Sequence, residues 1–213
     1  MEEGPNTLRA KYVTHSVCLR CASLGLGCCS RCHPFVLLED IATLWKNYSL
    51  DEVKTIVEVA EILPIYREHL SDPEMVPIYY PWKGSYYRLQ TRFVKGSCIA
   101  LIPNKGCLLG ENRPLICKVW PFWWKEGSKP SMDEEFPLEI EGECTMFSSW
   151  KFSKEEVLRE LGFSEPAIRK ALFSLKIALE EHGRILKKAG EANIPPEGLL
   201  DWFLKRIFAG RLL

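Results

Sequence analysis

The 213-residue sequence has no excess of charge of either sign, because 28 lysines and arginines balance 28 aspartates and glutamates. Proteins that bind duplex nucleic acid usually carry a basic excess, so we expect no nucleic-acid partner. The chain also lacks an apolar run long enough to span a bilayer. Its start, MEEGPNTLRAKYVTH, lacks the basic segment and long apolar stretch of a secretory signal. We therefore expect a cytoplasmic protein with no membrane partner.

Catalytic motifs are equally scarce in this chain. The pattern G-x-G occurs only at Gly25 and Gly27, between cysteines and outside the strand–helix context of a nucleotide site. No grouping of Ser, His and Asp stands out. The sequence therefore names no catalytic residue and no residue that binds an organic cofactor, and it leaves open whether the protein is an enzyme.

Cysteine, in contrast, is abundant, with nine residues of which five fall within one stretch, CLRCASLGLGCCSRC. Thiolates at this density repel one another, and free thiols oxidise, so a bound metal is the simplest reason to keep them together. The reducing cytoplasm also disfavours structural disulfides. We therefore expect a centre with cysteine ligands. The candidate metal ligands are Cys18, Cys21, Cys28, Cys29, Cys32, Cys98, Cys107, Cys117 and Cys144.

Two of the cysteine spacings are typical of chelation. Cys18 with Cys21, and Cys29 with Cys32, each leave two residues between sulfurs, which a tight turn brings to one metal. If the adjacent Cys28 and Cys29 are extended, their side chains point in opposite directions. One division assigns the two C-x2-C pairs to one site and the four later cysteines to a second, and one composite site is the alternative. His15 and His33, which flank the cluster, are less favoured ligands.

The cysteines stand in a wider pattern of motifs. Its elements are Cys18-x2-Cys21, Cys28-Cys29, Gly96-Ser97-Cys98 through Lys105-Gly106-Cys107, Glu111-Asn112-Arg113-Pro114-Leu115-Ile116-Cys117 followed by Trp120-Pro121-Phe122, and Glu141-Gly142-Glu143-Cys144. Over roughly residues 15–150 this pattern resembles the YkgJ-like cysteine-cluster family, which is described as zinc- or iron-chelating. The chain departs from the family in the six residues between its first two cysteine groups, in Thr145-Met146 after the last cysteine, and in the additional Cys32.

The resemblance implies an iron–sulfur or zinc centre, and three functions follow as alternatives. The first is an iron–sulfur protein, of the 4Fe-4S type, with a redox or sensing role. The second is a structural zinc module that binds a protein partner. The third is a cluster-dependent enzyme related to protein lysine N-methylases, since related domains occur in the flagellin lysine N-methylase. Four thiolates can bind either a zinc ion or an iron–sulfur cluster, so the type of ligand does not distinguish the first alternative from the second.

Hydrophobic periodicity predicts an α-rich α+β fold. We expect helices over 34–48 and 50–63, the second opened by a capping box of Ser49 and Glu52. Alternation predicts a strand over 87–93 with Arg88, Gln90 and Arg92 on its exposed face. The expected elements that follow are a hairpin over 98–109, a short helix carrying Cys117, a strand leading into Cys144, and helices from Ser153 onward.

We expect residues 1–150 to form the cysteine-cluster metal-binding domain and residues 151–213 a helical extension packed on it. Arg113 is a candidate for tuning the centre, or else a solvated arginine. The aromatic run at 120–124 and His182 are expected in the core, and His69 on the surface.

Overall fold

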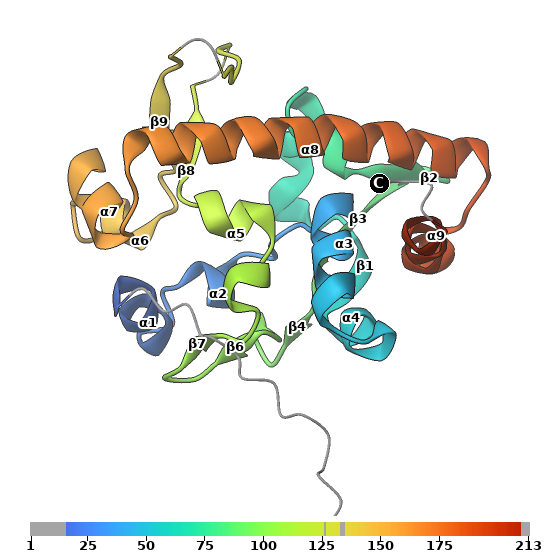
Figure 1. The fold of residues 1–213 in the computed structure, drawn as a ribbon, viewed down its shortest axis with the longest axis horizontal. Helices are drawn as coiled ribbons and strands as arrows, with labels where there is room; N and C mark the ends of the chain where they lie inside the picture. The colour runs from blue at the N-terminus through green and yellow to red at the C-terminus, as the bar shows by residue number, and fades with distance from the viewer. Residues whose placement is uncertain (1–15, 126, 133–134, 210–213) are drawn as a thin grey trace, which may run out of the picture.

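The computed structural model describes residues 16–125, 127–132 and 135–209, and it confirms the α+β class. A long helix, α8 (Glu165–Glu191), crosses the molecule; most of the shorter elements lie below it in this view, and β9 projects above it (Figure 1). In the described part of the chain, no helix combines the length and the apolar character that crossing a bilayer requires.

The C-terminal helices form as their sequence predicts. Ser153 accepts the backbone N–H of Glu156 and opens α7 (Lys154–Glu160), and Ser164 likewise caps α8. The apolar stripe of α8 is buried along its length, and α9 (Pro196–Phe208) follows after a proline-containing turn. Helix α8 ends at Glu191, with Gly190 in its last turn.

Helices α3 (Leu38–Asn47) and α4 (Leu50–Ile56) lead directly into the sheet, and α4 is shorter than expected. Helix α4 begins at the predicted capping box, in which Ser49 and Glu52 bond reciprocally. The helix predicted to continue to residue 63 instead becomes strand β1 (Val57–Glu61). The β-branched Val57 and Val59 pair with another strand there, so sheet pairing overrides a pattern that also fits a helix.

The main sheet has three antiparallel strands in the order β1-β3-β2. Strand β3 (Ser85–Thr91) is central, and β2 (Tyr80–Trp82) is an edge strand in the proline-rich stretch. The expected exposed face of β3 is wrong, because Arg88 and Gln90 are buried along with Leu89 and Thr91. Arg88 and Gln90 form hydrogen bonds with neighbouring polar groups, and a polar side chain that is bonded in this way can be buried. The alternation of polar and apolar residues therefore does not predict which face of this strand is exposed.

The cysteines lie on or beside short elements outside the main sheet. The predicted hairpin exists between β6 (Leu101–Ile102) and β7 (Gly106–Cys107). Cys98 belongs to a separate hairpin, because β5 (Ser97–Cys98) pairs with β4 (Phe93–Val94). The remaining elements are α1 (Ser16–Ser23), α2 (Cys28–Arg31), η1 (Pro64–Ser71), η2 (Val76–Ile78), η3 (Gly110–Asn112), α5 (Leu115–Val119), β8 (Phe122–Trp124), β9 (Leu138–Ile140) and α6 (Thr145–Ser148).

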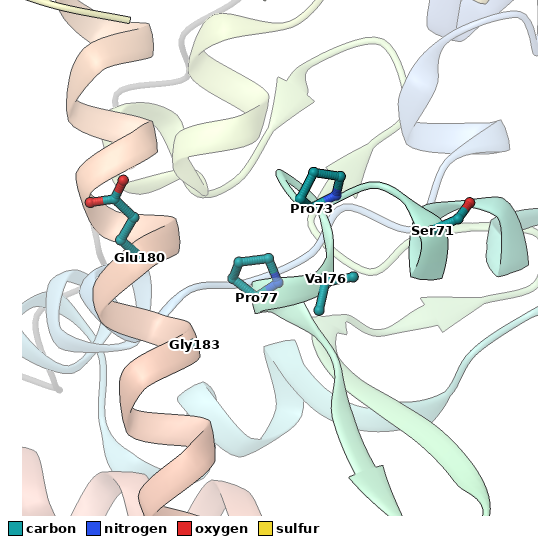
Figure 2. A pocket seen from close by; sticks show the side chains of 6 residues that line it. All are labelled: Ser71, Pro73, Val76, Pro77, Glu180 and Gly183. Atoms are coloured by element: carbon teal, nitrogen blue, oxygen red, sulfur yellow. The ribbon is translucent and has the colours of Figure 1, made fainter. Parts of the chain in front are cut away.

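Two apolar clusters make up the core, and α8 contributes to both. The first contains Phe122, Trp124 and the N-terminal half of α8, with Trp123 packed against it, so the aromatic run is core except for Trp120, which is half-buried and belongs to neither cluster. The second lies between α3, α4, the sheet and α9, with Phe203 fully buried. Helix α8 approaches η2 so closely that a Cβ on Gly183 would stand 2.8 Å from Pro77 Cβ, which explains glycine there (Figure 2).

Candidate metal centre

The short elements bring the cysteines to one side of the molecule, beneath the N-terminal half of α8. Helix α1 packs against α2 and β7, α2 packs against β5, and α5 packs against α8 (Figure 1). Cys18 and Cys21 lie on α1, Cys28 and Cys29 on α2 with Cys32 as its C-cap, Cys98 on β5, Cys107 on β7, Cys117 on α5, and Cys144 just before α6. All nine are free thiols.

The local geometry of the first cysteines differs from the expected tight turns and extended pair. Cys18 and Cys21 share one face of a helix, since residues three apart on a helix are neighbours. Cys28 and Cys29 lie in one helical turn and hydrogen-bond to each other through their side chains. This contact lowers the pKa of Cys28 and raises that of Cys29, because one thiol donates to the other's sulfur.

A first group of thiols forms where α1 and α2 meet the segment before α6. The hydroxyl of Thr145 donates to the carbonyl of Leu26 at 2.9 Å, which holds Cys144 beside the loop that joins the two helices. The Cys18 side chain is exposed at one edge, but the protein around its sulfur removes much of its solvation, and this, followed by the charge of Cys28, raises the pKa of Cys18 to about 12. Burial, and then the charge of Cys144, raise the pKa of Cys21 to about 11. These four cysteines therefore share one environment.

A second group forms where α2 meets the two small hairpins and α5. Cys98 is buried, and its thiol donates to the hydroxyl of Thr91 at 3.4 Å. The pKa of Cys29 is raised first by its contact with Cys28 and then by burial. The charges of Cys28, Cys117 and Cys98 add to this rise. Burial, and then the charges of Cys28, Cys107 and Cys98, raise the pKa of Cys117. Cys29, Cys98, Cys107 and Cys117 are thus close neighbours, with Cys28 at the boundary.

Arg113 lies between the two groups. Its positive charge lowers the pKa of Cys18, Cys107 and Cys117 against a larger rise caused by burial, and it adds to the lowering of the pKa of Cys28 by Cys29. Its Nε is buried and has no hydrogen-bond partner. A buried donor without an acceptor costs about 1–3 kcal/mol, so this atom needs an acceptor that the protein does not provide. Among cysteines, an anionic sulfur centre is the fitting acceptor.

The helix that carries Cys117 is anchored by a buried carboxylate. Asp40 in α3 accepts the backbone N–H of Leu37 through Oδ2 and that of Leu115 through Oδ1, both at 2.8 Å. Burial raises the pKa of Asp40 to about 7, while the two backbone donors oppose this rise. Asp40 therefore joins the start of α3 to the start of α5 and positions Cys117. The sequence offers no signal for this long-range contact.

Sequence reasoning also missed a polar network beside Cys32. Arg88 donates to the carbonyl of His33 at 2.8 Å and to Gln90 at 3.1 Å, and its guanidinium lies 4.1 Å from the Tyr66 ring centre. The network fixes the backbone just after Cys32. Cys32 itself has a pKa raised to about 12 by burial, then by the charges of Cys28 and Glu143.

The histidines are less suited to be ligands than the cysteines. The ring of His33 stacks on Phe93 with centroids 3.9 Å apart, and its Nδ1 is buried without a partner. His69, expected on the surface, is half-buried and bonds the hydroxyl of Tyr79 at 2.9 Å. His182 is buried in the core as predicted. His15 lies outside the described residues.

The donor set is consistent with a sulfur-bound metal, although it is not organised around one. Among the described residues, no three Cys, His, Asp or Glu side chains are arranged to hold a metal ion. Three of the thiols, Cys21, Cys98 and Cys144, are buried, five are half-buried and Cys18 is exposed, and Arg113 carries an unused buried donor among them. Metal binding requires loss of the thiol protons, so the raised pKa values make it depend on pH.

Two shallow cavities lie elsewhere. One, of about 580 Å³, is lined by Pro73, Val76, Pro77 and Gly183 between η2 and α8 (Figure 2). The other, of about 280 Å³, includes Phe147 and lies beside α6. No cysteine lines either cavity, and neither supplies a polar site for a substrate.

Comparison with known proteins adds no relative. No family model, no curated protein and no solved structure matches this chain. The resemblance to the YkgJ-like family therefore stays a prediction from the cysteine motifs alone.

Proposed function

We propose that this protein binds metal through its cysteines and that the centre is an iron–sulfur cluster of the 4Fe-4S type with a redox or sensing role. The observation that supports this most directly is the buried, unpartnered Nε of Arg113, whose charge acts on four cysteines from four separate elements. A centre of four thiolates is anionic, so a buried guanidinium both compensates its charge and donates to its sulfur.

The residues around the cysteines include groups that would tune the reduction potential of a bound cluster. Burial disfavours charge on a cluster, whereas a cation and N–H donors stabilise the reduced, more negative state. Arg113 supplies the cation, and the backbone amides of Leu109 and Gly110 face the sulfur of Cys107 closely enough to oppose the rise of its pKa. When bound, the cluster would supply one-electron chemistry, and these groups would set its reduction potential.

A structural zinc site is the second candidate, and the size of the surrounding elements favours it. Strands β4, β5, β6 and β7 have two residues each, and α2 has four. Elements this short bury little apolar area of their own, so cross-linking by a metal would contribute much of their stability. In this case the centre organises a surface for a protein partner and carries no electrons.

The experiment is a measurement of metal, acid-labile sulfide and visible absorption on protein purified without oxygen. The proposal expects iron and sulfide in equal amounts with a broad visible band. Zinc without sulfide would overturn the cluster and support the second candidate. As a control, Cys18, Cys21 and Cys117 are replaced by serine together. Bound metal unchanged by this substitution would overturn the cysteine ligation altogether.

Arg113 provides a sharper test that does not depend on ligand loss. Arg113→Leu removes the cation and should lower the reduction potential of the cluster while leaving its iron content near the wild-type value. Arg113→Lys keeps the charge and loses the planar donor, so the shift should be smaller. Arg159→Leu, which removes the same charge from an exposed position on α7, is the matched control. Equal potentials in all four proteins would contradict the assigned role.

A further inference from the structure

We propose that the polar network around Arg88 is a binding site for a small oxyanion, a phosphate or carboxylate group, which Arg88, Tyr66 and His69 bind through their N–H and O–H groups. The site uses none of the cysteines as ligands and requires no metal. It therefore goes beyond the function proposed above and does not depend on it.

Arg88 is a buried cation without a counter-charge. It lies on the central strand β3 and is only 2% exposed. No carboxylate of the described residues forms an ion pair with it. Glu58, the carboxylate that joins this network, bonds Gln90 at 3.1 Å and lies 4.0 Å from Arg92. A charge removed from water is costly unless an opposite charge compensates it, so this position favours an anion.

The hydrogen bonds of Arg88 also leave donors unused. A guanidinium has five N–H groups. Within the described part of the chain, three acceptors face it: the carbonyl of His33 at 2.8 Å, the side chain of Gln90 at 3.1 Å and the hydroxyl of Tyr79 at 3.5 Å. All three are neutral. Nη1 and Nη2 each make one of these bonds, so each keeps one N–H for a further acceptor.

Two side chains of η1 add donors beside this guanidinium. Residues three apart share one face of a 3₁₀ helix, so Tyr66 and His69 lie together, with ring centres 5.4 Å apart. The ring centre of Tyr66 lies 4.1 Å from the guanidinium carbon of Arg88. The hydroxyl of Tyr66 accepts the backbone N–H of His33 at 3.2 Å, so its own hydrogen can donate to a ligand.

The hydrogen bonds also assign the proton of His69. The hydroxyl of Tyr79 accepts from Arg88, so it donates its hydrogen to Nδ1 of His69, 2.9 Å away. A neutral imidazole that accepts at Nδ1 carries its proton on Nε2. His69 therefore presents a donor, as Tyr66 and Arg88 do, and a group of neighbouring donors suits an oxyanion.

Arg88 is also the strongest single charge acting on this face of η1. Burial lowers the pKa of His69, and among charged groups Arg88 has the largest effect, ahead of Glu68, Asp72 and Glu143. The guanidinium lies under the ring, so an anion that bridges the two meets a positive charge first.

Helix η1 covers Arg88 and is lightly attached to the core. None of its eight residues is buried, and Leu70 is the one that packs against the first apolar cluster. Its polar contacts with the rest of the protein run through Tyr66 and His69. A 3₁₀ helix of this length is uncommon, and such stretches often mark hinges. Helix η1 is thus the segment that moves to admit the anion.

The test is isothermal titration calorimetry of the full chain with inorganic phosphate and, separately, with acetate at constant ionic strength. One anion should bind per chain. Arg88→Gln should weaken binding at least about tenfold, and Tyr66→Phe, which keeps the ring and loses one donor, about fivefold. Arg67→Gln is the matched control, because it removes the same charge from an exposed position on η1 and should change the dissociation constant less than about twofold.

The outcomes separate this site from its alternatives. Tighter binding of phosphate or of acetate identifies the group, and either result supports the site. No saturable binding of either probe by the wild type overturns it, and so does equal weakening by Arg88→Gln and Arg67→Gln, which would show general charge attraction. Phosphate binding by metal-free protein would support this site even if the proposed function fails.

A second measurement uses the wild-type protein and so avoids variants that fold poorly. Trypsin cleavage after Arg67 should slow when phosphate is saturating, because the anion adds hydrogen bonds to Tyr66 and His69 on the same helix. A cleavage rate that phosphate does not change would contradict the role of η1 as the cover of the site.

Discussion

The helical C-terminal region and the cysteine region are built on opposite principles. Helix α8 alone spans 27 residues and buries nine of them, while the four strands around Cys98 and Cys107 have two residues each. Apolar burial therefore stabilises the first region without help. The second region depends on single polar anchors, such as Asp40 and Thr145, and on what its thiols bind.

The largest effect is expected in the core beneath α9. Phe203 is fully buried, so Phe203→Ala should lower the free energy of unfolding by about 3–5 kcal/mol. Phe208, on the same helix, is 77% exposed, so Phe208→Ala should change it by no more than about 0.5 kcal/mol. Chemical denaturation with and without a chelator measures both. A loss at Phe203 that disappears on chelation would contradict the independence of this region from metal.

Acid should destabilise the helical region through His182. Its Nδ1 accepts the N–H of Leu38 at 3.1 Å, and burial lowers its pKa from 6.5 to about 4. The unfolded chain takes up a proton below pH 6.5, whereas the folded protein does not until about pH 4. The free energy of unfolding should therefore fall as pH decreases across this window, by up to ~3 kcal/mol.

The measurement for His182 is denaturation at several pH values in the wild type and in His182→Gln. The variant keeps an acceptor and loses the titration, so its stability should vary less between pH 6.5 and pH 4. An identical acid slope in both proteins would assign the effect to other groups.

Asp40 joins α3 to the cysteine-bearing helix α5, so its replacement should lower stability and also change the reactivity of Cys117. Asp40→Asn leaves a single carbonyl oxygen for two backbone N–H donors, and the expected loss is about 1–3 kcal/mol. Because α5 loses its anchor, Cys117 should react faster with iodoacetamide. Glu39→Gln, at an exposed position on the same helix, should change neither quantity. Unchanged labelling of Cys117 in Asp40→Asn would show that α5 is held by its packing on α8 alone.

The accuracy of the sequence predictions differs between local and long-range features. The capping boxes at Ser49 and Ser153 were predicted correctly, because their bonds join residues three apart. The helix predicted over 57–61 was wrong, because pairing with β3 decides the conformation of a segment that suits both states. The exposed face assigned to Arg88 and Gln90 was wrong for a related reason, since their partners come from residues 33, 58 and 79.

The sequence by itself determined the α+β class, the stripe of α8, the caps, and a density of cysteine that packing alone does not call for. These features depend on period, on neighbouring residues and on composition, all of which can be read along one dimension. Only the tertiary structure decided which thiols are neighbours, that Arg113 lies among them, and that Asp40 holds the helix of Cys117. Those contacts join residues from separate elements, and burial, which depends on the whole fold, sets their energies.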